Sequence, residues 1–251
     1  KYILITNFIS MNARKKPFND IKVRKAFSHL FNKEEYMKLV TIGSNVIKGN
    51  GYIPKGLVGY DPSLIDYEYS LDMANKLLDE AGYKDRSRLG TITMIRTNYL
   101  PFHKEFKKLI EEFYRRVKIN IVVKHIPHTK LIELMNAYEY QMLNAEASTE
   151  FPEAYYLLAD FHSKSNCHYS GVIIPELDQL LDEVLFMNLK RERVTNYHKI
   201  EKLIKNYALN IHPNYGTFQN DYYKKYVHGL NISPLGSVIL KMKDVWLEPS
   251  N

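Results

Sequence analysis

The spacing of apolar residues in the first third of the chain predicts a strand, a helix, a long loop and a second helix. Residues 1–9 (KYILITNFI) are dense in isoleucine, leucine and aromatic residues, which is typical of a buried strand. Over residues 20–40 the apolar positions fall on one face at helical spacing, and Asn19 or Asp20 can cap the start of this helix. Glycines and prolines over 42–62 favour an ordered loop, after which helical spacing resumes over 73–81.

The middle of the chain has the pattern of a strand–helix–strand unit. Residues 91–95 (TITMI) alternate like a strand, and residues 102–117 carry the apolar stripe of a long amphipathic helix. Residues 119–126 (INIVVKHI) then return as a strand, and two strands joined in this way lie parallel in one sheet. A short helix after Thr129 and a strand near 139–145 complete the pattern of an α/β lobe.

Beyond residue 146 the pattern becomes mostly helical. Pro175 can open a helix at its first position, and a second helix is predicted over 197–207. The end of the chain, from Asn214, is aromatic and extended and then looped. The sequence shows neither a repeat nor a flexible linker, so we expect any two lobes to be joined by ordered crossings.

Composition indicates a folded protein with one large core or two modest ones. The chain has 251 residues, of which 45% are hydrophobic. No apolar run approaches the roughly 18 to 20 residues of a membrane span. The first residues already have a strand pattern, so we expect the sequence to come from a longer protein. The single cysteine, Cys167, excludes an internal disulfide.

The net charge of +7 raises the hypothesis of nucleic-acid binding. The charge is dispersed, however, because Glu111 and Glu112 stand four residues before Arg115 and Arg116, the favourable orientation for helical ion pairs. The 20 tyrosines can stack on bases, but aromatic residues beside basic ones are expected at this content. Solvated helix faces explain the charge, and nucleic-acid binding stays a distant alternative.

Candidate groups for catalysis and metal binding have no supporting motif. Cys167 beside His168, or a serine near His162, can supply a nucleophile and a base, but G-x-S-x-G, P-loop and G-x-G-x-x-G motifs are absent. For a metal, His162, Cys167 and His168 lie close in sequence, and His125 and His128 are three residues apart. Zinc sites usually show two clear ligand pairs at fixed spacing, and this pattern is not complete here.

Carboxylates near the middle of the chain are better candidates for a binding site. The segment 144–161 (NAEASTEFPEAYYLLADF) follows a strand and carries Glu146, Glu150 and Glu153. A carboxylate there can receive an amine or a cation. The alternative is that Glu150 or Glu153 lies in the first turn of a helix, where negative charge is favoured. Further on, His198 and Glu201 share a helix face, and without an H-E-x-x-H motif we interpret them as a surface pair.

The order of several short motifs resembles a known family. A strand ends near Asn7, and Pro17, Phe18, Asp20, Val23, Arg24 and Ala26 then match a PF-D-VR-A pattern. There follow a G-IP-G--GYDP loop at 51–62, a helix ending in EAGY at 80–83, FHS-SN--Y at 161–169, E-D-LLDE at 176–183, R---YHKIEKLI at 193–204 and YVHGL at 226–230. Over nearly its whole length the chain therefore resembles the C-terminal half of the dipeptide/oligopeptide-type solute-binding proteins of ABC importers, bacterial extracellular solute-binding protein family 5.

This resemblance implies an α/β fold that is periplasmic-binding-protein-like (type II). The chain would be a fragment containing one complete α/β lobe plus the C-terminal part of the other lobe. Residues 8–143 would form the second lobe, and residues 1–7 and 144–251 would supply the hinge crossings and the C-terminal portion of the first lobe. Ligands of the family lie in the cleft between the lobes, so the fragment would hold half of the site.

The resemblance also implies a function. The protein would be an extracytoplasmic solute-binding component, in the periplasm or an equivalent compartment, that is membrane-associated through its transporter. It would be a monomer without enzymatic activity, cofactor or nucleic-acid partner, and it would deliver an oligopeptide or similar polar solute to ABC permease subunits. A non-peptide solute such as a nickel complex, a sugar or an opine is the first alternative, and a basic nucleic-acid-binding module is the more distant one.

The second crossing departs from the peptide-binding pattern of the family. Peptide-binding members typically have Trp, two residues and then Asp there, with the Asp pairing with the peptide's α-amine, and the matching positions are Ala147 and Glu150. Glu150 keeps the charge on a side chain one methylene longer. An arginine often found just upstream is Asn144 here. We predict that the following residues face the ligand: Asn144, Ser148, Glu150, Phe151 and, at the end of the 91–95 strand, Asn98.

Overall fold

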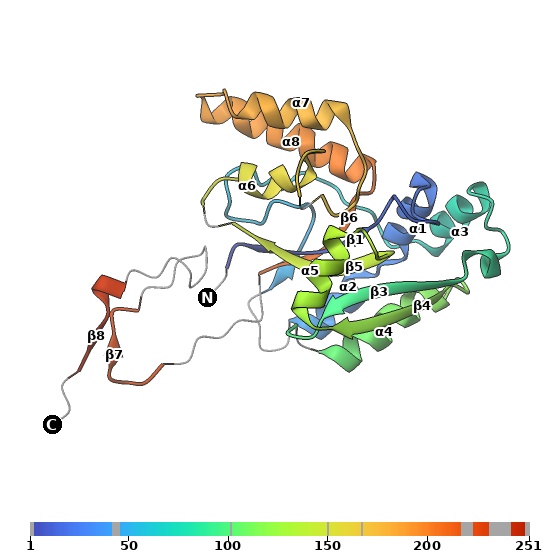
Figure 1. The fold of residues 1–251 in the computed structure, drawn as a ribbon, viewed down its shortest axis with the longest axis horizontal. Helices are drawn as coiled ribbons and strands as arrows, with labels where there is room; N and C mark the ends of the chain where they lie inside the picture. The colour runs from blue at the N-terminus through green and yellow to red at the C-terminus, as the bar shows by residue number, and fades with distance from the viewer. Residues whose placement is uncertain are drawn as a thin grey trace.

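The computed structural model describes residues 3–41, 46–100, 102–149, 151–166, 168–216, 223–230 and 242–248. Within these ranges the main body is a six-stranded mixed sheet with helices on both faces (Figure 1). Its strands are β1 (Ile5–Met11), β2 (Ile47–Lys48), β3 (Thr91–Thr97), β4 (Asn120–Ile126), β5 (Met142–Ser148) and β6 (Asn210–Tyr215). The α-helices are α1 (Ile21–Leu30), α2 (Lys33–Val40), α3 (Leu71–Glu80), α4 (His103–Arg115), α5 (His128–Asn136), α6 (Tyr155–Leu158), α7 (Pro175–Val184) and α8 (Lys190–Asn206). A separate pair, β7 (Val227–His228) and β8 (Trp246–Leu247), lies away from the main body in Figure 1.

The strand order places the carboxyl ends of four strands, β3, β4, β5 and β6, on one side of the sheet. The order is β2-β6-β1-β5-β3-β4, and β3 is parallel to both β4 and β5, which confirms the predicted strand–helix–strand unit. The antiparallel strand β1 begins where β5 ends, with Ile5 opposite Ser148. The N–H of Gly216, just after β6, donates to the Ile5 carbonyl at 2.8 Å. We use the name carboxyl edge for the side of the sheet at which these strands end, on the left in Figure 1; it is not an edge strand.

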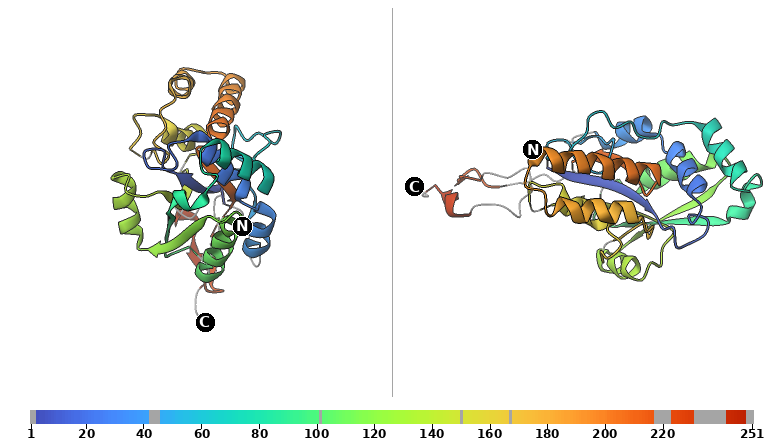
Figure 2. Two further views of the ribbon diagram at one scale, coloured as in Figure 1. Left: turned by 90° about the vertical axis from the view of Figure 1, so that its right-hand side faces the viewer. Right: turned by 90° about the horizontal axis from the view of Figure 1, so that it is seen from above.

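Two hydrophobic cores cover the two faces of the sheet. One core holds α1, α2, α3 and α4, and the other holds α6, α7 and α8 together with Leu131 of α5 (Figure 2). Strand β5 supplies both cores by alternation, since Met142 belongs to the first core and Leu143 to the second. A strand buried on both faces explains the apolar runs that the sequence shows at several strands.

The predicted helix over 20–40 is wrong in one respect, because it is two helices. Asp20 caps α1 as expected, accepting the N–H of Lys22 at 2.7 Å. Phe31 then leaves the helical conformation, and the Asn32 side chain accepts the N–H of Glu35 at 3.1 Å to start α2. An asparagine that caps a new helix competes with continuation of the old one. The apolar stripe hid this break because it continues on both sides of it.

Residues 151–216 pack on the same sheet as residues 5–148. Strand β6, which the sequence analysis did not predict, pairs with β1 and β2, and helices α7 and α8 share a core with Tyr52, Ile53 and β5. Residues 151–216 therefore share one sheet with residues 8–143. Where the boundary between two lobes of a complete protein falls stays a prediction.

The interpretation of Glu201 as part of a surface pair is wrong. Glu201 is 2% exposed, and its carboxylate accepts the backbone N–H groups of Tyr52 at 2.5 Å and Ile53 at 2.9 Å. Burial raises the pKa of Glu201 to about 8, although the two N–H donors act in the opposite direction. Helix α8 thereby holds the loop around Gly51. The backbone of Gly51 lies so close to Glu201 that a side chain has no room there, since an added Cβ would lie 2.6 Å from the Glu201 carboxylate.

Candidate functional site

Polar side chains from four elements meet near the carboxyl edge, on the face covered by α2 and α4. Arg96 of β3 donates from Nε to Oδ1 of Asn144 on β5 at 2.9 Å. Asn144 in turn donates from Nδ2 to Oδ1 of Asn7 on β1 at 2.9 Å. Glu146 lies two residues further along β5 and accepts a hydrogen bond from Asn7, and Tyr36 of α2 lies close enough to Arg96 to act on its pKa in the upward direction. We call Asn7, Tyr36, Arg96, Asn144 and Glu146 the edge cluster.

Arg96 is the centre of the edge cluster. Its side chain is 3% exposed, its guanidinium lies 4.2 Å from the centre of the Phe106 ring, and Nη1 is 3.4 Å from the Leu100 carbonyl. Burial lowers the pKa of Arg96 to about 10, so the group stays charged at neutral pH. Arg96 therefore joins β5 to the loop that leads from β3 into α4.

One carboxylate oxygen of Glu146 accepts no hydrogen bond from the described residues. Oε1 is buried and has no hydrogen-bond partner in the part of the chain that the structure describes. Burial raises the pKa of Glu146 to about 7, and the Asn7 hydrogen bond and the charge of Arg96 limit the rise. Near neutral pH this group can accept a hydrogen bond from a ligand when ionised, or donate one when protonated.

Replacing Glu146 with glutamine is expected to make folding stability less dependent on pH. The pKa of Glu146 in the folded chain, about 7, lies above the ordinary value of about 4.3. The contribution of this group to the free energy of unfolding is therefore fully present below about pH 4.3 and is lost as the pH rises through about 7. Glutamine keeps an acceptor for Asn7 without titrating. Between about pH 5 and pH 8 the wild type should lose about 1–3 kcal/mol relative to the variant in urea unfolding. Equal losses would contradict this prediction.

Two histidines and a tyrosine extend this region towards solvent. The rings of His103, at the start of α4, and His125, on β4, meet edge to face with centres 4.5 Å apart. Nδ1 of His103 and Nε2 of His125 are buried without a partner among the described residues. Burial and the charges of Arg96, His103 and Lys107 lower the pKa of His125 to about 4, so this ring is neutral. Tyr99 is 57% exposed, and its ring meets that of His128 edge to face with centres 5.4 Å apart.

The residues predicted from the sequence lie around the carboxyl edge but in different settings. Asn144 is fully buried, and its amide is used within the edge cluster. Ser148 ends β5 and is exposed, as is Asn98, whose N–H donates to the Ile126 carbonyl at 2.9 Å. Phe151 is half exposed and stacks on Tyr156. Glu150 lies outside the described residues. Ligand contact by these residues stays a prediction.

Sequence reasoning missed Arg96 and Tyr36 and did not select Glu146 from its segment. The members of the edge cluster are up to 139 positions apart and meet only through the strand order. One signal was present, since Arg96 is a charged residue inside the strand TITMIRT, where burial demands a partner.

His162 and His168, two of the histidines considered for catalysis or metal binding, have structural partners. His162 lies 3.7 Å from Asp178 and 3.3 Å from Asp182, and Nε2 of His168 is 2.7 Å from the Val172 carbonyl. Cys167 lies outside the described residues. Across the ranges that the structure covers, no group of three or more His, Cys, Asp or Glu side chains is placed to hold a metal ion.

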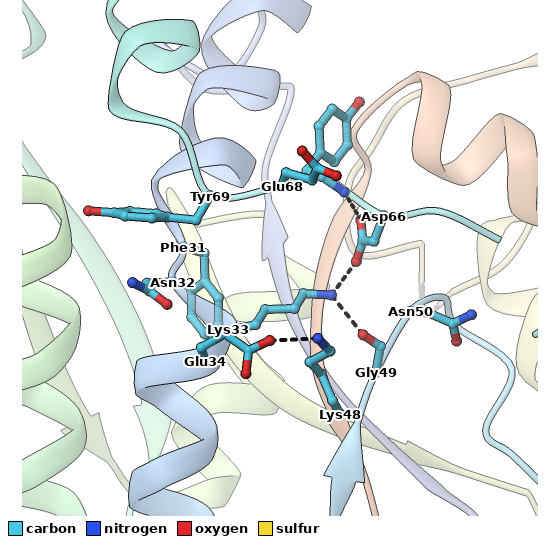
Figure 3. A pocket seen from close by; sticks show the side chains of 11 residues that line it. Phe31, Asn32, Lys33, Glu34, Lys48, Gly49, Asn50, Asp66, Glu68 and Tyr69 are labelled. Atoms are coloured by element: carbon cyan, nitrogen blue, oxygen red, sulfur yellow. Dashed lines mark hydrogen bonds and ion pairs between the residues drawn. The ribbon is translucent and has the colours of Figure 1, made fainter.

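A cavity of about 270 Å³ lies between α2, β2 and the segment that leads to α3 (Figure 3). The buried ammonium group of Lys33 donates to Asp66 and, at 2.9 Å, to the Gly49 carbonyl, and burial lowers its pKa. Lys48 pairs with Glu34 at 2.6 Å at the mouth. These charged groups pair with each other, so we interpret them as contacts that stabilise the edge strand β2.

Comparison with known proteins decides the family. The model of the middle region of the bacterial extracellular solute-binding proteins, family 5, matches residues 2–168. The chain belongs to this family. The resemblance seen in the sequence motifs is thereby confirmed, and none of the helices in the described ranges has the length and apolar character of a membrane span.

Relatives in family 5 are longer than this chain. The dipeptide-binding protein of Escherichia coli (strain K12) is 24% identical over 238 residues, which cover 93% of this chain and 44% of that protein. The Di/tripeptide-binding protein 2 of Pseudomonas aeruginosa (strain UCBPP-PA14) is 40% identical over 79 residues, covering 32% of this chain and 15% of that protein. The chain thus spans at most about half the length of the curated relatives it matches.

Solved structures support the fold. The periplasmic binding protein DppA of Helicobacter pylori in complex with the peptide STSA matches with a TM-score of 0.85 at 21% identity, covering 98% of this chain and 48% of that one. The oligopeptide-binding protein AppA of Bacillus subtilis in complex with a nonapeptide matches with a TM-score of 0.84 at 18% identity, covering 99% and 52%. The predicted α/β, periplasmic-binding-protein-like fold in a fragment-sized chain is confirmed.

Proposed function

We propose that the chain is part of the solute-binding component of an ABC importer and forms one wall of a cleft that captures an oligopeptide or similar polar solute. The observation that carries this proposal is the polar edge cluster at the carboxyl ends of parallel strands. In open α/β sheets, ligands bind outside these ends. The family supports an extracytoplasmic binding role, and the names of several relatives support a peptide.

In this proposal two lobes close around the solute. The approach to β1 and the exit from β6 are the crossings to the other lobe, because the Gly216 N–H donates to the Ile5 carbonyl at 2.8 Å and both leave the carboxyl edge. Strand β5 and helix α6 share one core, which favours the exit from β6 over the crossing near 144–150 that the resemblance implies. Contacts made only in the closed state shift the population towards it, and the closed protein is what permease subunits receive.

The solute would meet the exposed residues at this edge. Ser148 and Asn98 offer hydrogen bonds, Phe151 offers an aromatic face, and Glu150 stays our candidate acceptor for an amine. Buried Asn144 acts through the edge cluster by holding β5 in place. The whole protein would work as a periplasmic or other extracytoplasmic monomer whose partners are the solute and the permease, without catalysing a reaction.

Replacing Glu150 with alanine is expected to weaken peptide binding by about 10-fold to 100-fold, since a charge-assisted hydrogen bond contributes about 1.5–3 kcal/mol. The protein would be produced with both lobes and screened by thermal shift against a library of short peptides and small polar solutes. The control is Glu133→Ala, which removes a carboxylate that is 65% exposed on α5 and should leave binding unchanged.

Each other outcome has a clear meaning. If short peptides raise the melting temperature equally for Glu150→Ala and the wild type, the amine-acceptor role is wrong. If only a sugar, an opine or a nickel complex stabilises the protein, the binding role stands and the peptide is wrong. If no solute stabilises it while nucleic acid binds with a steep dependence on salt, the proposed function is overturned.

A further inference from the structure

Five large apolar side chains are exposed at one end of the lobe. Their exposed fractions are 51% for Phe151, 50% for Tyr156, 57% for Leu185, 83% for Phe186 and 61% for Leu189. We call these residues the apolar end. Single exposed apolar residues are common, but a group of large ones at one place is typical of an interaction surface.

The members of the apolar end lie near one another. Phe151 and Tyr156 stack with ring centres 4.5 Å apart, and the other three residues occupy the turn from α7 into α8. Arg193 joins the two parts, because it donates to the Met187 carbonyl in the turn at 3.1 Å and lies 3.4 Å from Glu153, which stands between Phe151 and Tyr156. Tyr197 of α8 also donates to Glu153.

The apolar end points to the same side as the carboxyl edge. Figures 1 and 2 both show the turn between α7 and α8 at the end of the molecule where β1 begins and β6 ends. Within this turn Met187 packs against the core and its carbonyl accepts from Arg193, whereas Phe186 is 83% exposed and projects outwards. Charged residues of both signs flank the turn, because exposed Lys190, Arg191 and Glu192 follow it and Asp182, whose side chain is 61% exposed, precedes it.

We propose that the turn residues of the apolar end, Leu185, Phe186 and Leu189, pack against an apolar surface of the other lobe of the complete protein. This inference rests on the two-lobed arrangement in the proposed function. The chain spans about half the length of its relatives, and both crossings leave the lobe at this end. The other lobe is therefore the surface within reach of Phe186.

Hydroxyl-radical footprinting of the complete protein, without solute, tests this proposal. The modification rate of each side chain is measured in the native protein and in the same protein unfolded in urea. Met73 on α3, at the opposite end of the lobe and 42% exposed, is the internal control. If Phe186 is covered, its protection should be at least about fourfold, because its exposed fraction would fall from 83% to about a fifth, whereas Met73 should be protected only about twofold.

A second measurement tests whether Phe186 and Leu189 make a stabilising contact with the other lobe. Phe186→Ser combined with Leu189→Ser should lower the unfolding temperature of the complete protein, and the matched variant Met73→Ser should not. Phe186 modified as fast as in urea would overturn the proposal. Protection that appears only at concentrations where light scattering detects dimers, or only after anionic phospholipid vesicles are added, would overturn it in favour of a second copy or a membrane. Since no solute is used, failure of the proposed function would not by itself produce any of these results.

Discussion

Replacing Glu201 with alanine is expected to destabilise the folded chain by about 3–5 kcal/mol, because two buried N–H groups lose their acceptor and a void opens beside Gly51. The carboxylate of Glu201 accepts from Tyr52 and Ile53, and the side chain is 2% exposed, so water cannot replace it without rearrangement. Urea unfolding followed by circular dichroism measures the change. The control Glu133→Ala, on the exposed face of α5, should change stability by less than about 0.5 kcal/mol.

Replacing Glu201 with glutamine tests the same contact through its pH dependence. The pKa of about 8 in the folded chain lies above the ordinary value of about 4.3, so the stability is fully present below that value and lost as pH rises through about 8. Glutamine keeps an acceptor for both N–H groups and does not titrate. Between about pH 5 and pH 8 the wild type should lose about 2–4 kcal/mol relative to Glu201→Gln. Parallel pH profiles would show that Glu201 is ionised in the folded chain throughout.

Local patterns predicted the elements whose signals are local. The alternation over 91–95 and the stripe over 102–117 correspond to β3 and α4, and Pro175 does open α7. Strand β6 was missed because its sequence, NIHPNY, contains a proline and is rich in polar residues. The pairing shows why the strand forms, since its register against β1 shifts between Ile211 and Asn214, and such an irregularity accommodates Pro213.

Side chains that meet through the fold were harder to predict. Glu201 shares the buried face of α8 with Tyr197, Ile200 and Ile204, so its burial was visible in the spacing, but its partners lie about 150 residues earlier. The edge cluster depends on β1 lying between β5 and β6, an order that hydrophobic periodicity does not encode. The family resemblance directed attention to Glu150, just beyond β5, rather than to Glu146 and Arg96, and ligand contact by any of these residues stays a prediction.

Replacing Arg96 with methionine is expected to destabilise the chain by about 2–4 kcal/mol. The substitution leaves Oδ1 of the fully buried Asn144 without its donor and removes the cation that lies 4.2 Å from the Phe106 ring. Methionine keeps most of the apolar stem, so the loss reports the guanidinium rather than a cavity. The control is Arg115→Met on the exposed face of α4, where the side chain is 78% exposed and the expected change is below about 0.5 kcal/mol.

A second readout distinguishes loss of the Arg96 charge from general loosening of the site. The positive charge of Arg96 lowers the pKa of Glu146, so removing it should raise that pKa further above about 7 and move the pH-dependent loss of stability to higher pH. In the Glu146→Gln background this movement should disappear, because the titrating group is gone. If Arg96→Met shifts the pH profile equally in both backgrounds, the two groups are not coupled and the edge cluster is two separate contacts. If the shift is confined to the chain that carries Glu146, Arg96 and Glu146 form a charge-coupled pair at the carboxyl edge.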